Sequence, residues 1–188
     1  MAPSSRCSRG DGSMTGRDPS PTAATVIVTI ADEAALGPLA RALAATLPAR
    51  AFLALDGDLG AGKTTFVKAL AAAAGIDPAE VVSPTFGLVH VHPLPDGHRA
   101  ERLVHADLYR LAGCDDLFEL GWEELTAAPG WVAAEWSKRI KPALPADRLD
   151  ILLEVESETA RRASFTGRGA ALAPLLTALR ALPGASSG

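Results

Sequence analysis

The sequence predicts an α/β fold, a mixed and partly parallel sheet flanked by helices, and three observations lead to it. Short apolar runs rich in β-branched residues alternate along the chain with segments of helical character. A glycine-rich loop at 57–62 joins one such strand to a helix, which is a connection typical of parallel sheets. The turn-rich segment 93–97 joins two further strands directly, so part of the sheet is expected to be antiparallel.

The elements follow from local signals. Residues 25–30 are β-rich, and Asp32 is a plausible N-cap for the helix that follows. Gly75 closes the helix after the glycine-rich loop, and Pro142 and Pro145 mark a loop late in the chain. Strands are expected at 25–30, 51–56, 86–92, 103–107, 131–135, 149–156 and 162–166, and helices at 33–46, 63–74, 115–127 and 170–182.

The composition fits one globular domain and excludes two classes of protein. The chain has 188 residues, of which 48% are hydrophobic and 21% charged, enough apolar material for a sizeable core. Its longest apolar run, 69–74, is far shorter than the roughly 20 residues of a membrane helix, so no membrane role is expected. The chain contains neither Asn nor Gln, so it cannot carry the guanine-binding Asn-Lys-x-Asp motif or the catalytic Gln of Ras-like GTPases.

The net charge and the cysteine content indicate which partners and which cellular compartment to expect. The formal net charge of −4 provides no broad basic surface, so a role on nucleic acid is expected to need a protein partner. Only Cys7 and Cys114 occur, which makes a disulfide framework improbable and favours a reducing cytoplasm. Residues 1–24 are rich in Ser, Pro, Gly and Arg and are expected to be a disordered N-terminal extension, whereas 25–188 form the domain.

The strongest motif is the glycine-rich loop itself. Residues 57–64 read Gly-Asp-Leu-Gly-Ala-Gly-Lys-Thr and match G-x-x-x-x-G-K-[ST] at every position, which predicts a single P-loop NTPase-like domain. Lys63 should reach the β and γ phosphates of a nucleotide, the Thr64 hydroxyl should bind Mg²⁺, and Thr65 should reach the α phosphate. The remaining phosphate contacts are expected from the loop residues Asp58, Leu59, Gly60, Ala61 and Gly62.

Two acidic residues end apolar strands and are candidates for the same site. Asp107 follows the run 103–106, and Glu135 follows 131–134. Ligands of open α/β sheets lie beyond the carboxyl ends of the strands, and Mg²⁺ prefers oxygen ligands. For each acid alone, a solvated carboxylate at a strand end is the alternative.

These residues resemble the TsaE family, the P-loop ATPase subunit of bacterial tRNA threonylcarbamoyladenosine synthesis. The resemblance covers roughly 25–166. It rests on Gly-Asp-Leu-Gly-Ala-Gly-Lys-Thr-Thr at 57–65, Ser-Pro-Thr-Phe at 83–86, His-Ala-Asp-Leu-Tyr-Arg-Leu at 105–111 and Glu-Trp at 135–136. It implies an ATPase that works with Mg²⁺ and the proteins TsaD and TsaB, and that meets tRNA only through their complex.

The resemblance also implies roles for individual residues. Thr64 and Glu135 look like the Mg²⁺ ligands, and Asp107 like the acid that polarises or positions water beside Lys63. Thr85 resembles a γ-phosphate sensor in a switch-like loop, and Trp136 a functionally important tryptophan. Ser83 and Pro84 belong to that same loop. The positions at which relatives bind the nucleotide base correspond only loosely to 31–33 and to Arg161 or Arg162 in this sequence. Many relatives have Tyr at the position of Phe86 and Pro at that of Ser137.

Other interpretations stay open at this point. A turn entering a strand is the alternative for 83–85, and a core aromatic is the alternative for Trp136. A small-molecule kinase would need an acceptor site and a basic lid, for which Arg161, Arg162 and Arg168 are the candidate group. A nucleotide-gated binding module without meaningful turnover is the third possibility.

Two weaker clusters are expected to be solvated. His90 and His92 share a strand face and could chelate a metal, but solvent-facing imidazoles are favoured. The acids between 115 and 124 are expected to be solvated helix charges or a contact for a basic partner.

Overall fold

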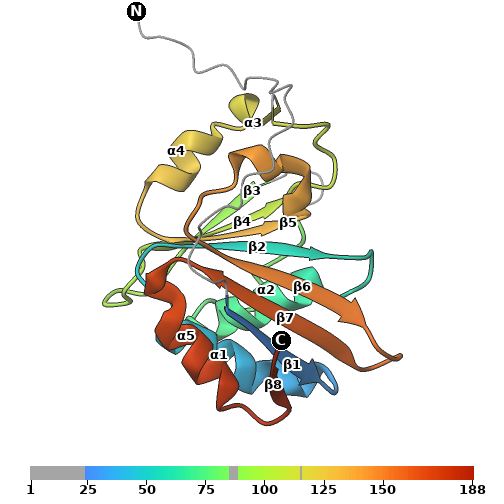
Figure 1. Ribbon diagram of the computed structural model, residues 1–188. Coiled ribbons are helices and arrows are strands. Elements are labelled where there is room, and N and C mark those ends of the chain that lie inside the picture. Colours follow the sequence, from blue (N-terminus) through green and yellow to red (C-terminus); the bar gives the residue numbers. More distant parts are fainter. Residues whose placement is uncertain (1–23, 85–88, 115) are drawn as a thin grey trace, which may run out of the picture.

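The computed structural model describes residues 24–84, 89–114 and 116–188, and its strands form one sheet (Figure 1). The strand order is β3-β4-β5-β2-β6-β7-β1-β8, in which β4, β5, β2 and β6 run parallel and the flanking pairs run antiparallel. The predicted fold class is therefore confirmed. The strands are β1 Ala24–Ile30, β2 Ala51–Gly57, β3 Val89–Pro93, β4 Arg102–Asp107, β5 Trp131–Glu135, β6 Arg148–Val155, β7 Arg161–Arg168 and β8 Ala185–Ser187.

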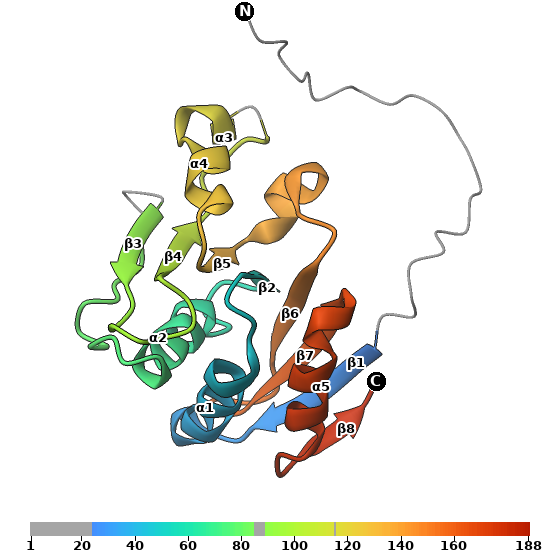
Figure 2. The same ribbon diagram turned by 90° about the vertical axis from the view of Figure 1, so that its left-hand side faces the viewer.

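Three α-helices pack together on one face of the sheet, as Figure 2 shows. They are α1 Leu36–Thr46, α2 Lys63–Ala73 and α5 Ala173–Arg180, and the short 3₁₀ helices η1 Glu33–Ala35 and η3 Ala170–Leu172 precede α1 and α5. The core beneath them is built from fully buried aliphatic and aromatic side chains such as Leu43, Leu70 and Phe165. This face holds α2 against the parallel strands, so the amino end of α2 lies at their carboxyl ends.

Shorter helices cover part of the opposite face. They are α3 Asp116–Glu119, α4 Trp122–Ala127 and the 3₁₀ segment η2 Ser137–Ala143. A second apolar cluster lies beneath them, in which Phe52 meets Trp122 edge to face at 6.2 Å between ring centroids and Ile140 is fully buried. Because both faces of β2 and β5 are covered, these strands read as continuous apolar runs in the sequence.

Two predicted helix boundaries are confirmed by their hydrogen bonds. The Asp32 side chain accepts from the Ala35 amide at 3.0 Å and caps η1, which leads directly into α1. At the other boundary, Gly75 takes a φ of 92° just after α2, and the Ile76 amide donates back to the Ala71 carbonyl at 2.9 Å.

Other element predictions were wrong or incomplete. The single helix expected at 115–127 is two short helices, because Gly121 takes a left-handed φ of 62° between them. The sequence pattern also missed β8 and η2. The segment Ala185–Ser187 has no apolar alternation and is a strand only through its pairing with β1. The terminal helix is interrupted, with η3 preceding α5, and the strand expected at 86–92 is described from Val89 onward.

The predicted extension lies almost wholly outside the described residues. Its last residue, Ala24, already belongs to β1. Within the described part of the chain, no helix is long and apolar enough to cross a membrane.

Candidate functional site

The candidate site lies where β2, β4 and β5 end. These strands run parallel, and the register places Asp107 opposite Glu135 and Glu135 opposite Leu55. Because parallel strands share one carboxyl edge, both acids predicted from strand ends reach the edge at which β2 enters the glycine-rich loop. The structure therefore brings the two acids together with the P-loop.

The P-loop turns through glycines whose conformations other residues disfavour. Gly57 has a φ of 143°, and a Cβ there would lie 2.3 Å from the Leu153 carbonyl oxygen, which leaves no room for a side chain. Gly62 has a φ of 97°, and its carbonyl accepts from the Phe66 amide at 2.8 Å as α2 begins. Between these two glycines the residues Asp58, Leu59 and Gly60 are exposed.

Lys63 is held inside the loop that precedes it. Its side chain is buried, with its Nζ donating to the carbonyls of Gly57 at 2.8 Å and Asp58 at 2.9 Å. The ring of Trp136 covers the same nitrogen, 3.8 Å from the ring centroid. The cation predicted to meet phosphate is thus already oriented by the loop backbone and one aromatic face.

The electrostatic surroundings of Lys63 are strongly acidic. Burial lowers the pKa of Lys63 from its ordinary value, and the nearby carboxylates of Glu135, Asp107, Asp56 and Asp58 oppose that shift. One buried cation thus faces several anions, and this excess of negative charge favours the binding of a further cation at this edge.

Thr64 and Glu135, the predicted metal ligands, touch each other. The Thr64 hydroxyl lies 2.9 Å from Oε1 and 3.1 Å from Oε2 of Glu135. Glu135 is almost fully buried, and its Oε1 also lies 2.7 Å from Nε2 of His105. The hydroxyl and the carboxylate converge from elements 71 residues apart in the sequence.

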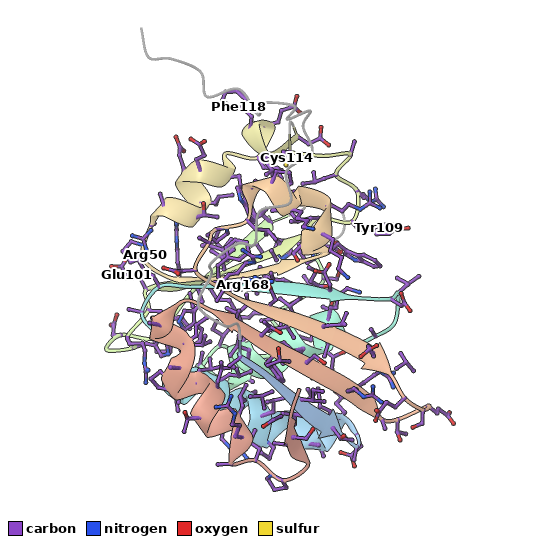
Figure 3. The ribbon with its side chains drawn as sticks, viewed as in Figure 1. Arg50, Glu101, Tyr109, Cys114, Phe118 and Arg168 are labelled. Carbon is purple, nitrogen blue, oxygen red and sulfur yellow. The ribbon has the colours of Figure 1, made fainter. Side chains whose placement is uncertain are left out.

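Asp107 is the neighbouring acid and is also buried. Its Oδ1 accepts from the Tyr109 amide at 3.0 Å, so the backbone just beyond β4 fixes the carboxylate. Tyr109 itself points outward at the carboxyl edge of the strands, across the molecule from Arg50 and Glu101 (Figure 3).

Trp136 follows Glu135 in an unusual backbone conformation. Its φ of 60° makes it the one non-glycine residue of the described chain with a left-handed φ. Such a conformation costs an L-residue on the order of 1–2 kcal/mol, so surrounding contacts must hold it. Its ring packs against Tyr109 at 5.0 Å between centroids and lies over Lys63. Trp136 therefore lies in the candidate site, and it also packs against the apolar cluster beneath α4 and η2.

The remaining predicted loop is only partly described. Ser83 is exposed and Pro84 is buried, whereas Thr85 and Phe86 lie outside the described residues. Their predicted role as a switch stays a prediction.

A cavity of about 320 Å³ extends the site beyond the P-loop. Thr65 lines it, as do Asp32 and Glu33 from the start of the first helical segment and Arg161 from β7. Both loosely predicted base-binding regions thus contribute to one cavity next to the phosphate loop. Arg162 is not among its lining residues and instead pairs with Glu156 at 2.7 Å.

The basic residues that a kinase lid would need are engaged elsewhere. Arg161 donates to the Ser157 carbonyl at 3.0 Å, in the turn that joins β6 to β7. Arg168 pairs with Asp150 across the same strands. Together with the Arg162 pair, these contacts hold the strands together and occupy the three arginines that were the candidates for a lid.

The prediction of two solvent-facing imidazoles was wrong for His92. His90 is half-buried, but His92 is buried on the edge strand β3. Burial lowers the pKa of His92, and repulsion from His105 and His90 acts in the same direction. The described residues contain no cluster of three or more potential metal ligands among their His, Cys, Asp and Glu side chains.

The acidic segment behaves as expected in part. Glu123 and Glu124 are exposed, whereas Asp116 is half-buried and accepts from the Ala112 amide at 2.7 Å. Asp116 therefore stabilises the loop before α3, and Asp115 lies outside the described residues.

Sequence reasoning missed His105 as a residue of this site. His105 belongs to the motif at 105–111, but no role of its own was predicted for it, and its side chain contacts Glu135. The available signal was strand alternation, which places residues 105 and 107 on one face of β4.

Comparisons with known proteins show which family this chain resembles. A family model described as "Threonylcarbamoyl adenosine biosynthesis protein TsaE" matches residues 30–163. The tRNA threonylcarbamoyladenosine biosynthesis protein TsaE of Nostoc is 38% identical over 74% of this chain and 84% of its own length. The Aquifex aeolicus protein of the same name is 41% identical over 63% of this chain and 77% of its own length. The crystal structure of Bacillus subtilis YdiB superposes with a TM-score of 0.64 at 29% identity, covering 85% of this chain and 97% of YdiB.

Proposed function

Because this chain belongs to the TsaE family, we propose that it binds and hydrolyses ATP as a subunit of the machinery that makes threonylcarbamoyladenosine in tRNA. The observation that carries the proposal is the contact of Thr64 with Glu135 immediately beside the buried Lys63. A P-loop threonine, a strand-end carboxylate and a lysine in this arrangement are the parts that a Mg²⁺–nucleotide site requires.

The donor set fits Mg²⁺. The Thr64 hydroxyl and the Glu135 carboxylate supply oxygen atoms, which this small hard cation prefers, and nearby nitrogen and sulfur ligands are not needed. When bound, Mg²⁺ neutralises charge on the phosphate oxygens. Thr64 and Glu135 would hold it, and the already converged hydroxyl and carboxylate need little reorganisation to do so.

The phosphates would be bound by the loop and its lysine. Lys63 would exchange its contacts with the Gly57 and Asp58 carbonyls for β and γ phosphate oxygens. The backbone amides of 58–62 and the amino end of α2 add hydrogen bonds and a favourable dipole. Thr65 lines the adjoining cavity and would contact the α phosphate, so the base would lie near Asp32, Glu33 and Arg161.

For hydrolysis, we assign Asp107 the role of positioning or polarising the attacking water. The Tyr109 amide holds one carboxylate oxygen and thereby sets the orientation of the group. Thr85 is proposed to sense the γ phosphate, with Ser83 and Pro84 in the same loop. These assignments place acid, cation and metal ligands around a single phosphoryl group.

We further propose TsaD and TsaB as the protein partners, with tRNA met only through their complex. The net charge of −4 supports this indirect contact, since the chain has no broad basic field for RNA. Trp136 covers Lys63, and Ser83 and Pro84 belong to the proposed switch loop, so a bound nucleotide would alter the partner contact at these residues. Because tRNA is modified in the bacterial cytoplasm, we propose the cytoplasm as its compartment.

The kinase alternative has less support. It needs free basic residues over the transferred phosphate. Arg168 is instead paired with Asp150 on β6, and Arg162 with Glu156 in the turn that follows β6. The binding-module alternative differs from the proposal only in turnover, so turnover must be measured.

The test is ADP release by the full chain alone, with TsaD and TsaB, and with candidate kinase acceptors. Lys63→Ala should lose MgATP affinity by about ten- to hundredfold, since one charge-assisted phosphate contact contributes roughly 1.5–3 kcal/mol. Lys68→Ala on the same helix is the matched control and should bind as the wild type does. Partner-dependent ADP release that the Lys63 variant abolishes supports the proposal; acceptor-dependent release favours a kinase, and binding without release favours the module.

A further inference from the structure

His105 is the most deeply buried titratable side chain next to the proposed metal ligands. It has no exposed surface, and its Nε2 lies 2.7 Å from Oε1 of Glu135. Among the described residues, its Nδ1 has no hydrogen-bond partner. A buried imidazole with one nitrogen unpartnered is unfavourable for folding, so its single strong contact calls for an explanation.

The strand register explains how the contact arises. His105 pairs with Ala133 across the parallel β4–β5 ladder, and Asp107 pairs with Glu135 two residues later. Paired residues share a face of the sheet, so His105 lies diagonally adjacent to Glu135 on the face that carries α2. The same register places Asp107 beside Glu135. The two acids have different partners: Glu135 contacts the His105 imidazole, and Asp107 accepts from the Tyr109 backbone amide.

The chemistry of the contact fixes its direction. A carboxylate only accepts hydrogen bonds, so Nε2 of His105 must carry the hydrogen and donate it. Glu135 Oε1 then accepts from His105 and from Thr64, whereas Oε2 accepts only a longer bond from Thr64 among the contacts described. The imidazole therefore restrains one oxygen and sets the plane of the carboxylate.

We infer that His105 is a positioning residue that orients the Glu135 carboxylate toward the metal site through its Nε2–H donor. This inference rests on the proposed function, because it assigns the means by which a metal ligand of that site is held. Hydrogen-bond partners of metal ligands typically change metal affinity by about ten- to hundredfold when removed. His105 itself touches neither phosphate nor metal in this assignment.

The test compares three variants of the full chain by Mn²⁺ binding. His105→Phe fills the buried volume without a donor, and His105→Gln restores an N–H donor on a side chain of similar reach. His90→Phe is the matched control, because His90 is paired with His105 across β3 and β4 but belongs to no assigned part of the site. Electron paramagnetic resonance measures Mn²⁺ affinity with a non-hydrolysable ATP analogue, and calorimetry in EDTA measures metal-free nucleotide affinity.

We expect His105→Phe to weaken Mn²⁺ affinity about ten- to hundredfold while metal-free nucleotide affinity stays unchanged. His105→Gln should recover most of the Mn²⁺ affinity, and His90→Phe should match the wild type. Wild-type Mn²⁺ affinity in His105→Phe overturns the inference, as does a folded His105→Gln that is as weak as the Phe variant. If the wild type binds no nucleotide, the proposed function itself is overturned. That result differs from one in which His105→Phe binds nucleotide and keeps the wild-type Mn²⁺ affinity, which overturns only the inference.

A second measurement addresses the contact without nucleotide and without the Phe variant. In the full chain labelled with ¹⁵N histidine, the His105 Nε2 should carry the proton, and Glu135→Ala should shift its resonance. A His105 protonated only at Nδ1, or a resonance that Glu135→Ala leaves unchanged, overturns the inference.

Discussion

The Ser137 hydroxyl donates a hydrogen bond to the Asp56 carboxylate over 2.7 Å and so joins the turn after β5 to the end of β2. The Lys138 amide donates to the other Asp56 oxygen at 3.2 Å. Asp56 directly precedes the P-loop, and Ser137 directly follows Trp136. The strand that carries the phosphate loop thus also holds the left-handed turn that places an indole over Lys63.

Asp56→Ala should loosen this turn. Ser137 is buried, so an unpartnered hydroxyl there should lower the free energy of unfolding by about 1–3 kcal/mol. The Lys138 amide should exchange hydrogen faster in the variant. Chemical denaturation and hydrogen exchange measure the two effects, with the exposed Asp96→Ala as the control. Equal stability and equal Lys138 exchange in the two variants would show that the carboxylate does not hold the turn.

The two strand-end acids should differ in their kinetic effects. Glu135→Ala removes the acceptor of Thr64 and should weaken the Mg²⁺ dependence of nucleotide binding, because it removes a proposed metal ligand. Asp107→Ala should mainly slow hydrolysis in the partner complex, since its proposed task is to position water. Nucleotide titrations with and without Mg²⁺, followed by ADP-release rates, separate the effects. If both variants turn over ATP like the wild type with TsaD and TsaB present, the assignment of these acids is wrong.

His92 should make the protein less stable in mild acid. Burial holds the folded-state pKa of His92 below its ordinary value of 6.5, so the unfolded chain binds the extra proton first as pH falls. The contribution of His92 therefore favours unfolding progressively below about pH 6.5, down to the folded-state pKa. His92→Phe should flatten this part of the stability curve. Urea unfolding at pH 7.5 and pH 5.5 measures the difference, with His98→Phe as a control, and parallel curves for wild type and His92→Phe would contradict it.

Trp136→Ala should impair partner-stimulated turnover more than nucleotide binding. The indole contacts Lys63 and Tyr109 at the edge proposed to face TsaD and TsaB, so its loss changes the partner surface while leaving the loop amides in place. ATP should also support association with the partners better than ADP does. Pull-down and ADP-release assays with each nucleotide provide the measurement. Equal association in ATP and ADP, together with turnover unaffected by the variant, would leave the proposed coupling without support.

The sequence by itself determined the parts of the fold that depend on local pattern. The motif at 57–64 predicted a turn between a buried strand and a helix, and the structure has β2, that loop and α2 in this order. Asp32 and Gly75 mark helix ends through hydrogen bonds within a few residues, so their roles could be predicted. Asp107 and Glu135 could be predicted as site residues because carboxyl ends of parallel strands share one edge.

Only the tertiary structure decided which side chains meet. The contacts of Thr64 with Glu135 and of Ser137 with Asp56 span 71 and 81 residues, and they depend on β5 lying between β4 and β2. Burial of His92 and the strand β8 likewise depend on neighbours supplied by distant segments. Local pattern reports the conformation that a segment favours and the face it buries, whereas strand order sets which of those faces become neighbours. The direction of a carboxylate, and the imidazole that holds it, follow from that order.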